Sequence, residues 1–201
     1  ALSRVSFTVE AAVDETTNGN NLLDGNTRIN VKTIAITDGA FYQSGDLNLT
    51  DGSWSNQDGS LSEFSFSGTD HFYHTVKDKC AESSNEIDVI QLTRFNASKP
   101  QRVLNDESYL MIIPQENAEF KIYVEYDVIS GGYKNNGSGT YDESAITNKI
   151  TSAATITKTF EQGKAYNFNL VLGMTSVKFE VDEVTAWDES EGSQNEWLPE
   201  N

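Results

Sequence analysis

Two histidines are the residues of this chain best suited to binding a metal. His71 and His74 lie three residues apart within Asp70-His71-Phe72-Tyr73-His74. A metal-binding histidine pair favours a spacing of four on a helix or two on a strand, and it needs a third and a fourth ligand. This segment reads as a loop that offers neither spacing. We therefore predict loop or edge histidines and no metal site.

Cys80 is the only cysteine, so no disulfide can form within the chain. Lys77 and Lys79 are close in the sequence, and neighbouring positive charges lower the pKa of a thiol. No nearby residue suggests a general base or a resolving cysteine. We interpret Cys80 as an unreactive loop thiol.

No motif for hydrolysis or phosphate binding occurs. A nucleophile elbow needs Gly-x-Ser-x-Gly, and the nearest element, Gly137-Ser138-Gly139, falls in a loop of Gly, Asn and Ser. Phosphate-cradling glycine motifs are absent, and the 31 acidic residues single out no glycosidase pair. Acidic turns within residues 14–25 and 46–52 lack the ligand order of an EF-hand. We predict that the chain is not an enzyme and uses no cofactor.

The composition excludes two classes of partner. Fourteen basic residues against 31 acidic ones give a formal net charge of −17. That charge repels nucleic acid and anionic lipid headgroups, so we expect neither as a partner. No apolar run approaches the ~20 residues that cross a membrane as a helix. Ten Phe and eight Tyr provide enough apolar surface for a folded core.

Alternation of apolar and polar residues predicts β-strands along most of the chain. A change of register between Val31 and Ile34 predicts a β-bulge. Only residues 142–152 suggest a helix, through Ile146 and Ile150. We predict an all-β sandwich of about nine or ten strands with at most one short helix. Its predicted core consists of Phe7, Ile34, Ile112, Ile122, Val124, Phe168, Leu170, Phe179 and Trp187.

Two aromatic residues in polar surroundings could stack on sugar rings. Trp54 follows the Asp51-Gly52 turn, and Tyr133 lies in the Gly-rich loop of residues 131–140. Packing in the core or at an edge is the commoner role for such residues. A carbohydrate-binding surface module is therefore the alternative function, with Trp54 and Tyr133 as its candidate residues.

Several segments are similar, in order and spacing, to one family of surface proteins. They are Ala1-Leu2-Ser3-Arg4-Val5-Ser6-Phe7, Ser44-Gly45-Asp46-Leu47-Asn48-Leu49 with Gly52-Ser53-Trp54, Leu110 to Gln115, Tyr123 to Asp127, Phe160-x-x-Gly163-Lys164-x-Tyr166-x-Phe168, and Val184-x-x-Trp187. Together they resemble the C-terminal domain of the fimbrillin family, the Mfa-like subunits of type V pili in Bacteroidetes.

The resemblance implies a transthyretin-like, Greek-key β-sandwich over residues 1–187 and an acidic tail over residues 188–201. Family members are similar to two such domains in tandem, exported as lipoproteins and matured by arginine-specific proteolysis. The resemblance implies that an N-terminal domain and a lipid anchor belong to a longer precursor. Arg4 lies within a strand, so we expect cleavage elsewhere. The implied location is extracellular, in a fimbrium on the outer-membrane cell surface.

The resemblance also implies a structural or adhesive subunit whose partners are other pilus subunits, as a homo- or heteropolymer, and surface ligands of host or bacterial cells. Assembly would proceed by strand exchange, in which an edge with unpaired main-chain groups accepts a neighbour's extended segment. Trp197 and Leu198 are the apolar anchors of the tail if it is the donated strand. The polar run from Asp188 to Gln194 favours a solvated tail without a partner over this role.

Overall fold

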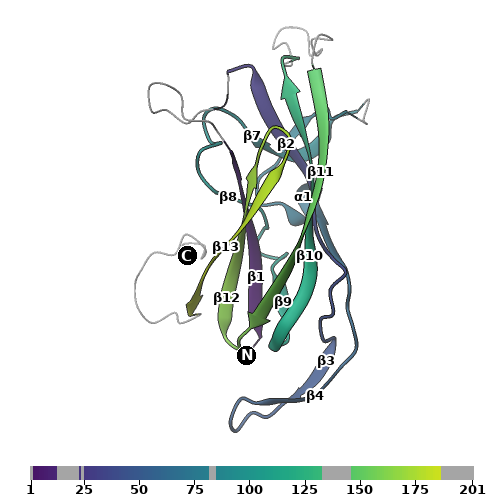
Figure 1. Cartoon of the computed structure of the whole chain (residues 1–201), viewed down its shortest axis with the longest axis vertical. Coiled ribbons are helices and arrows are strands. Elements are labelled where there is room, and N and C mark those ends of the chain that lie inside the picture. Colours follow the sequence, from purple (N-terminus) through teal and green to yellow (C-terminus); the bar gives the residue numbers. More distant parts are fainter. Residues whose placement is uncertain (1, 13–22, 24, 82–84, 133–145, 187–201) are drawn as a thin grey trace.

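Two β-sheets form the body of the molecule, and a two-stranded hairpin projects from one end along the long axis (Figure 1). The computed structural model describes residues 2–12, 23, 25–81, 85–132 and 146–186, with backbone alone from 181 to 186. These residues contain thirteen strands and one four-residue helix, α1 (Gly68–His71). None of the helices described is long or apolar enough to cross a membrane.

The first sheet has the strand order β13-β12-β1-β8, with β9 also paired to β1, and the second has the order β11-β10-β2-β7-β6, with β5 also paired to β2. The first sheet contains β1 (Ser3–Ala11), β8 (Gln101–Arg102), β9 (Leu110–Ile112), β12 (Lys164–Leu172) and β13 (Val177–Ala186). The second contains β2 (Thr27–Thr37), β5 (Phe64–Ser67), β6 (Val76–Asp78), β7 (Ile87–Leu92), β10 (Gln115–Ser130) and β11 (Ile146–Phe160). The hairpin consists of β3 (Ser44–Leu47) and β4 (Trp54–Asp58).

The predicted all-β sandwich is confirmed, and its core lies between the two sheets. Alternate residues of β10 are buried from Phe120 to Val128, as the period of a strand with one face inward requires. Phe179 is half-buried against this core, and Trp187 lies outside the described residues. The other predicted core residues are all buried: Phe7, Ile34, Ile112, Ile122, Val124, Phe168 and Leu170.

A ladder of polar side chains accompanies the parallel pairing of β1 with β12. Asn167 accepts a hydrogen bond from Ser6 at 3.2 Å and donates one to Thr8 at 2.9 Å. Thr8 donates to Asn169 at 3.0 Å, and Asn169 donates to Glu10 at 2.7 Å. Because a slip of one residue would break every one of these bonds, the ladder specifies the register of the first strand.

The bulge predicted between Val31 and Ile34 is present. Val31 pairs with Tyr126 and Thr33 with Glu125, so Lys32 is the extra residue that opposes no residue of β10. Val31 and Ile34 both remain fully buried on either side of it. The bulge thus preserves the core face while it directs Lys32 to the outside of the second sheet.

Two details of the predicted secondary structure were wrong. Residues 146–152 belong to strand β11 rather than to a helix, because β10 offers them a complete pairing edge; residues 142–145 lie outside the described part. The strand count is higher than nine or ten because several short strands join the sheet edges. Strands β9 and β10, separated by Pro114, lie in different sheets, since the chain crosses over at the proline.

Candidate functional site

Among the described strands, β13 at the end of the first sheet and β11 at the end of the second each have one unpaired edge, and both edges lie on the same side of the sandwich. Phe168 of β12 lies 5.8 Å from Phe120 of β10, and Phe7 of β1 lies 5.9 Å from Phe66 of β5, measured between ring centroids. Strand β12 therefore packs over β10, while β1 packs over β5. Strand β13 flanks β12 in the first sheet, and β11 flanks β10 in the second. Strands β13 and β11 therefore border the same side of the sandwich, which we call the seam.

Strand β11 is the longer border of the seam. It pairs with β10 from Ile146 to Phe160, and no described strand pairs with its other edge. An unpaired edge presents a row of main-chain donors and acceptors to any extended chain. Lys149 and Lys158 are its charged residues, so the strand is basic within an acidic protein. Fifteen residues make an unusually long open edge for a globular domain.

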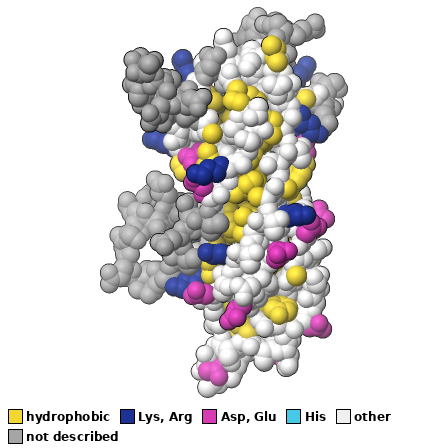
Figure 2. Space-filling view, viewed as in Figure 1, with side chains coloured by type: hydrophobic (Ala, Val, Ile, Leu, Met, Phe, Trp, Pro, Cys, Tyr) yellow, Lys and Arg dark blue, Asp and Glu magenta, His cyan; other side chains and the backbone are white. Residues whose placement is uncertain are grey.

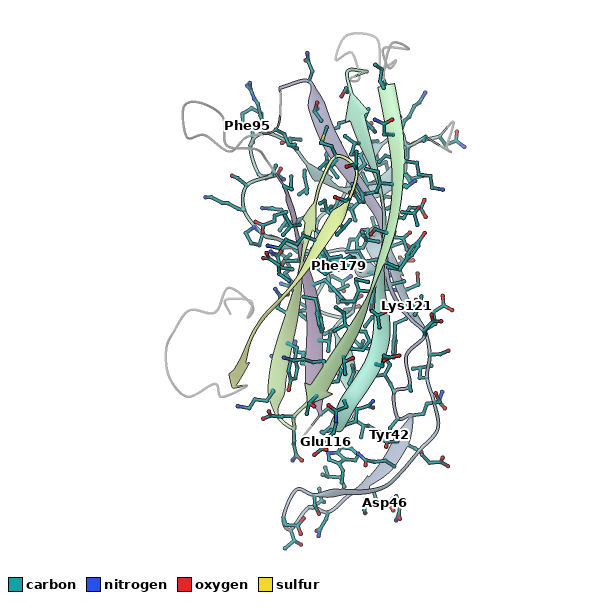
Figure 3. The ribbon with its side chains drawn as sticks, viewed as in Figure 1. Tyr42, Asp46, Phe95, Glu116, Lys121 and Phe179 are labelled. Atoms are coloured by element: carbon teal, nitrogen blue, oxygen red, sulfur yellow. The ribbon has the colours of Figure 1, made fainter. Side chains whose placement is uncertain are left out.

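Apolar side chains line both borders of the seam. Ile150 and Ile156 of β11, and Val177 and Phe179 of β13, pack against the core without being fully buried. Hydrophobic side chains form a band along the middle of this face in the space-filling view (Figure 2), and Phe179 lies near its centre (Figure 3). The seam therefore combines open main-chain edges with partly exposed apolar surface, the two features that β-strand addition uses.

One hydrogen bond ties the two sheets together beside the seam. The hydroxyl of Tyr126 on β10 donates to the carbonyl oxygen of Gly173, in the turn between β12 and β13, at 2.7 Å. The hydroxyl oxygen of Tyr126 also lies 3.2 Å from the carbonyl oxygen of Ser176. Burial raises the pKa of Tyr126 to about 12, so the hydroxyl keeps its proton at neutral pH. The Tyr126 hydroxyl can therefore donate the hydrogen bond that joins the two sheets throughout the neutral pH range.

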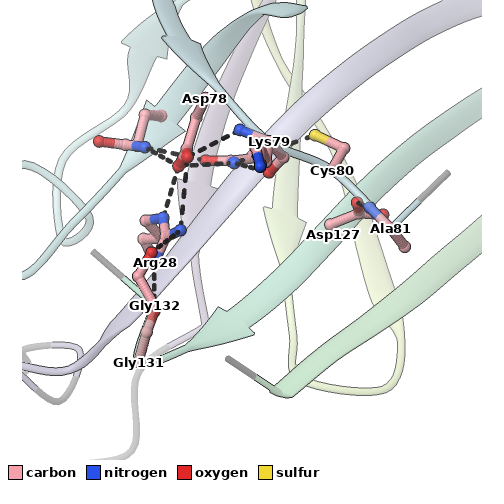
Figure 4. A network of polar contacts seen from close by, with 10 residues as sticks. Arg28, Asp78, Lys79, Cys80, Ala81, Asp127, Gly131 and Gly132 are labelled. Carbon is pink, nitrogen blue, oxygen red and sulfur yellow. Dashed lines mark hydrogen bonds and ion pairs between the residues drawn. The ribbon is translucent and has the colours of Figure 1, made fainter. Parts of the chain in front are cut away.

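A buried polar cluster lies on the outer face of the second sheet (Figure 4). Arg28 Nε donates to Asp78 Oδ2 at 2.5 Å, and Asn30 and Gln91 donate to the same oxygen at 3.0 and 2.8 Å. Burial acts to raise the pKa of Asp78, but the bonds from Arg28 and Asn30 outweigh it and hold the pKa below its ordinary value. The cluster anchors β6 across the sheet, and its groups are fully engaged with one another.

Lys32 forms a second ion-pair group beside this cluster. Its ammonium lies 2.8 Å from Glu125 and 2.9 Å from Asp127, which is fully buried. Cys80 is buried close by; its burial and the charge of Asp127 raise the pKa of the thiol to about 12. Burial and Asp127 thus outweigh the flanking lysines, which makes Cys80 a poor nucleophile at neutral pH. Cys80 lies in a loop, as predicted, but its side chain is buried and only 6% exposed.

A groove of about 560 Å³ separates the projecting hairpin from the base of the sandwich. Tyr42, which is 38% exposed, and Trp54 of β4 contribute aromatic surface to it, and Phe41, Phe64 and Met111 also line it. The Trp54 ring lies over Gly45, where an added Cβ would stand 3.2 Å from the ring. The amide of Gln57 donates to the carbonyl of Pro114 at 2.8 Å and fastens the hairpin to the sandwich.

The sequence-predicted site residues do not come together in one place. His71 ends α1 and forms a hydrogen bond with the backbone of Ser67, while the ring of His74 lies tilted against that of Tyr73, with the centroids 4.0 Å apart. Within the described residues, no group of three or more His, Cys, Asp or Glu side chains could hold a metal ion. Trp54 lies in the hairpin groove. Three further predicted residues lie outside the described part of the chain: Tyr133, Trp197 and Leu198.

The seam residues were missed as site residues when the sequence was read alone. Phe179 was assigned to the core, and Ile150 was assigned to a helix. The signal that could have found β11 is its content of β-branched residues, since eight of the residues 146–159 are Ile or Thr. That a strand has an open edge is a property of the assembled sheet, which no local pattern encodes.

Comparison with known proteins supports the fold. No family model and no curated protein matches this chain. A fimbrial protein from Bacteroides vulgatus is similar in structure with a TM-score of 0.67 at 17% sequence identity, over 93% of this chain and 54% of that one. A "putative cell adhesion protein" from Bacteroides ovatus matches with a TM-score of 0.39 at 15% sequence identity, over 94% of this chain and 46% of that one.

The two similarities differ in what they establish. At 17% identity, the first shows that this chain shares its fold with the fimbrial protein. The second, at a TM-score of 0.39, is too distant to carry an argument. The chain spans about half the length of either structure.

Proposed function

We propose that this chain is a structural subunit of a bacterial cell-surface fimbria and that it joins its neighbours by strand exchange at the seam. The observation that carries the proposal is the seam itself, where the 15-residue edge of β11 and the edge of β13 flank partly exposed apolar side chains. The shared fold with a fimbrial protein supports it. Its location on the outer membrane, in a fimbrium, is part of the same proposal.

The seam suits an extended segment from another subunit for two physical reasons. A strand laid along β11 would pair the open main-chain groups, which supplies affinity without requiring a particular sequence. Alternate side chains of that strand would face inward, onto Ile150, Ile156 and Phe179, and their burial would contribute about 25 cal/mol per Å² of apolar surface. Together these terms explain how a stable polymer could form without any enzyme-like site.

The acidic tail is the segment that we propose as the donated strand. Residues 188–201 contain five acidic residues and no basic one, whereas β11 contains two lysines and no acid. This charge complementarity favours a tail from one subunit on the β11 edge of the next. Trp197 and Leu198 would then supply the side chains that enter the seam.

The direct test uses the complete precursor, with every domain that it contains, treated with an arginine-specific protease. Light scattering should show the mass rising in multiples of the subunit after cleavage, and negative-stain microscopy should show filaments. The double variant Trp197→Ala, Leu198→Ala should lose this assembly, while Gln194→Ala in the same tail should retain it. A particle that stays monomeric before and after cleavage would refute the proposal.

A carbohydrate-binding module is the second candidate, favoured by the aromatic groove at the hairpin. Trp54 and the exposed Tyr42 line that groove, and aromatic rings stack on the apolar faces of sugars. A glycan array should then show saturable binding that Trp54→Ala abolishes. Phe95→Ala, which removes an exposed aromatic outside the groove, is the matched control. An array without saturable signal, or equal binding by both variants, would exclude this second function.

A further inference from the structure

The two most exposed large hydrophobic side chains among the described residues lie toward opposite ends of the long axis. Leu49, at the tip of the β3–β4 hairpin, is 90% exposed, and Phe95, in the turn of residues 93–100, is 83% exposed. Figure 3 shows Phe95 near one end and Asp46 of the hairpin at the other. Single exposed apolar residues are common on monomers, so these two side chains indicate a contact only together with the charges that surround each of them.

The two segments that carry these side chains have opposite charges. Residues 44–58 contain Asp46, Asp51 and Asp58 and no basic residue. Residues 93–100 contain Arg94 and Lys99, both exposed, and no acidic residue. In the space-filling view, acidic but no basic side chains are visible on the hairpin (Figure 2). At a net charge of −17, two copies repel each other unless such complementary surfaces meet.

Local hydrogen bonds hold both tips in place. In the hairpin, Asp51 Oδ1 accepts bonds from the backbone N–H and the hydroxyl of Ser53, at 2.9 and 2.7 Å, and Asn48 accepts from the N–H of Thr50 at 2.9 Å. These bonds fix the loop around Leu49, so its side chain is presented rather than folded back. A contact made by a fixed loop pays little conformational entropy.

The turn around Phe95 is fixed in the same way. Asn96 Oδ1 accepts from the N–H of Thr93 at 2.7 Å, and its amide donates to the carbonyl of Gln91 at 3.0 Å. The guanidinium of Arg94 lies 4.6 Å from the centre of the Phe95 ring, so the positive charge and the apolar ring form one surface. Both tips therefore pair an apolar side chain with charge of a single sign.

We propose that the hairpin tip around Leu49 and Asp51 contacts the turn around Arg94 and Phe95 of a second copy of this chain, head to tail. The two surfaces differ, so each copy offers one of each, and the contact repeats along an open array rather than closing a dimer. Its small area suits it to orienting subunits that another interaction links. The inference rests on the proposed fimbrial function, in which strand exchange at the seam provides that linkage.

Cysteine cross-linking in the soluble chain tests the contact without requiring a polymer. Leu49→Cys and Phe95→Cys variants are mixed in equal amounts at low salt under mild oxidation, and the dimers are resolved on a non-reducing gel. The native Cys80 does not compete, because it is buried. The matched control pairs Leu49→Cys with Met174→Cys, which places the second thiol at another exposed turn.

The 49–95 dimer should form about tenfold faster than the 49–174 dimer, since complementary charges steer the encounter. Raising the salt to about 1 M, where charges are screened beyond ~3 Å, should remove most of this difference. Asp51→Asn keeps the acceptor for Ser53 but removes the charge, and it should slow the 49–95 reaction alone. Equal rates for both pairs, or a rate unaffected by salt and by Asp51→Asn, would overturn the proposed contact.

The cross-linking result can be distinguished from the result of the polymerisation test of the proposed function. If the precursor forms filaments while 49–95 cross-linking stays at the control rate, the head-to-tail contact is contradicted and strand exchange is supported. Selective cross-linking by a chain whose precursor never polymerises would support the contact and sink strand exchange.

Discussion

The hydroxyl of Tyr126 and the carbonyl oxygen of Gly173 lie 2.7 Å apart and join the second sheet to the turn that ends β12. Gly173 can occupy this turn because it lacks a side chain: an added Cβ would stand 2.6 Å from the carbonyl oxygen of Ser176. The backbone of Gly173 instead donates to that oxygen at 2.7 Å. This tight turn places β13 at a fixed distance from β10, and so it sets the width of the seam at one end.

Removing the Tyr126 hydroxyl should weaken the fold and loosen the seam. We expect Tyr126→Phe to cost about 1–2 kcal/mol, because it breaks a buried hydrogen bond and leaves a carbonyl without its donor. Tyr123→Phe is the control, since that hydroxyl only reaches Glu125, at 3.1 Å near the surface. Urea unfolding followed by tryptophan fluorescence measures both. Equal losses from the two variants would contradict the structural role of Tyr126.

Alkaline pH should destabilise the protein through two buried groups. Burial raises the pKa of Tyr126 from 10.0 to about 12, and burial with the charge of Asp127 raises that of Cys80 from 9.0 to about 12. A group whose folded pKa is raised contributes stability below its unfolded pKa and loses it as pH rises through the folded value. Stability should therefore be constant up to about pH 9 and fall between about pH 9 and 12.

The variants Tyr126→Phe and Cys80→Ala separate the two contributions. Between pH 9 and 11, Tyr126→Phe should lose about 1 kcal/mol less than the wild type and Cys80→Ala about 2 kcal/mol less, because one pKa unit corresponds to ~1.4 kcal/mol and the unfolded thiol titrates a unit lower. Denaturant titrations at the two pH values measure the difference. A wild-type stability that stays level to pH 11 would show that neither group is buried as described.

Asp78→Asn should be among the most destabilising polar substitutions. It removes the carboxylate that pairs with Arg28, which is 2% exposed, and breaking a buried ion pair costs about 3–5 kcal/mol. Asp88→Asn is the control, because its partner Lys77 is exposed and surface pairs contribute about 0–1 kcal/mol.

The pH dependence of Asp78→Asn has a defined sign. A carboxyl with a lowered folded pKa contributes stability above its unfolded value, near 3.8, and loses it as pH falls through the folded one. The gap between wild type and Asp78→Asn should narrow below about pH 4. A gap that widens in acid would contradict the assigned ion pair.

Two core substitutions test the assigned strand faces. Val124 of β10 and Leu170 of β12 are fully buried, and each change to alanine should cost about 2–5 kcal/mol through the cavity that it leaves. Val76→Ala, at a position 45% exposed, should cost far less. Thermal melts of the three variants measure the comparison. An unchanged melt for Val124→Ala or Leu170→Ala would show that the strand faces are wrongly assigned.

How far the sequence predicts this structure depends on whether the signal is local. Alternation from Phe120 to Val128 predicts β10 because one face of that strand is buried along its whole length. The bulge at Lys32 is also predictable, since it shifts the register of the apolar residues around it. Residues 146–152 were predicted as helix because Ile146 and Ile150 are four apart, a spacing that fits a helix as well as an even strand face.

The candidate site is less predictable, for a physical reason. Ile150 and Phe179 become seam residues only because β11 and β13 end their sheets on the same side, and that is decided by pairings far apart in the sequence. Leu49 and Phe95 are single apolar residues in polar turns, and their exposure depends on how each turn is held. Local sequence patterns therefore predict the class of fold, whereas the seam and the two exposed tips depend on how the strands and turns pack in the folded chain.

Amide hydrogen exchange in the assembled polymer tests the central claim most directly. Monomer and protease-matured polymer are compared, peptide by peptide, over residues 146–160 and 177–186. Strand exchange at the seam predicts that the amides of β11 and β13 that point away from β10 and β12 exchange freely in the monomer and become protected in the polymer. Residues 64–67 of β5 serve as an internal reference. A polymer that forms while both edges keep their monomer exchange rates would contradict the account.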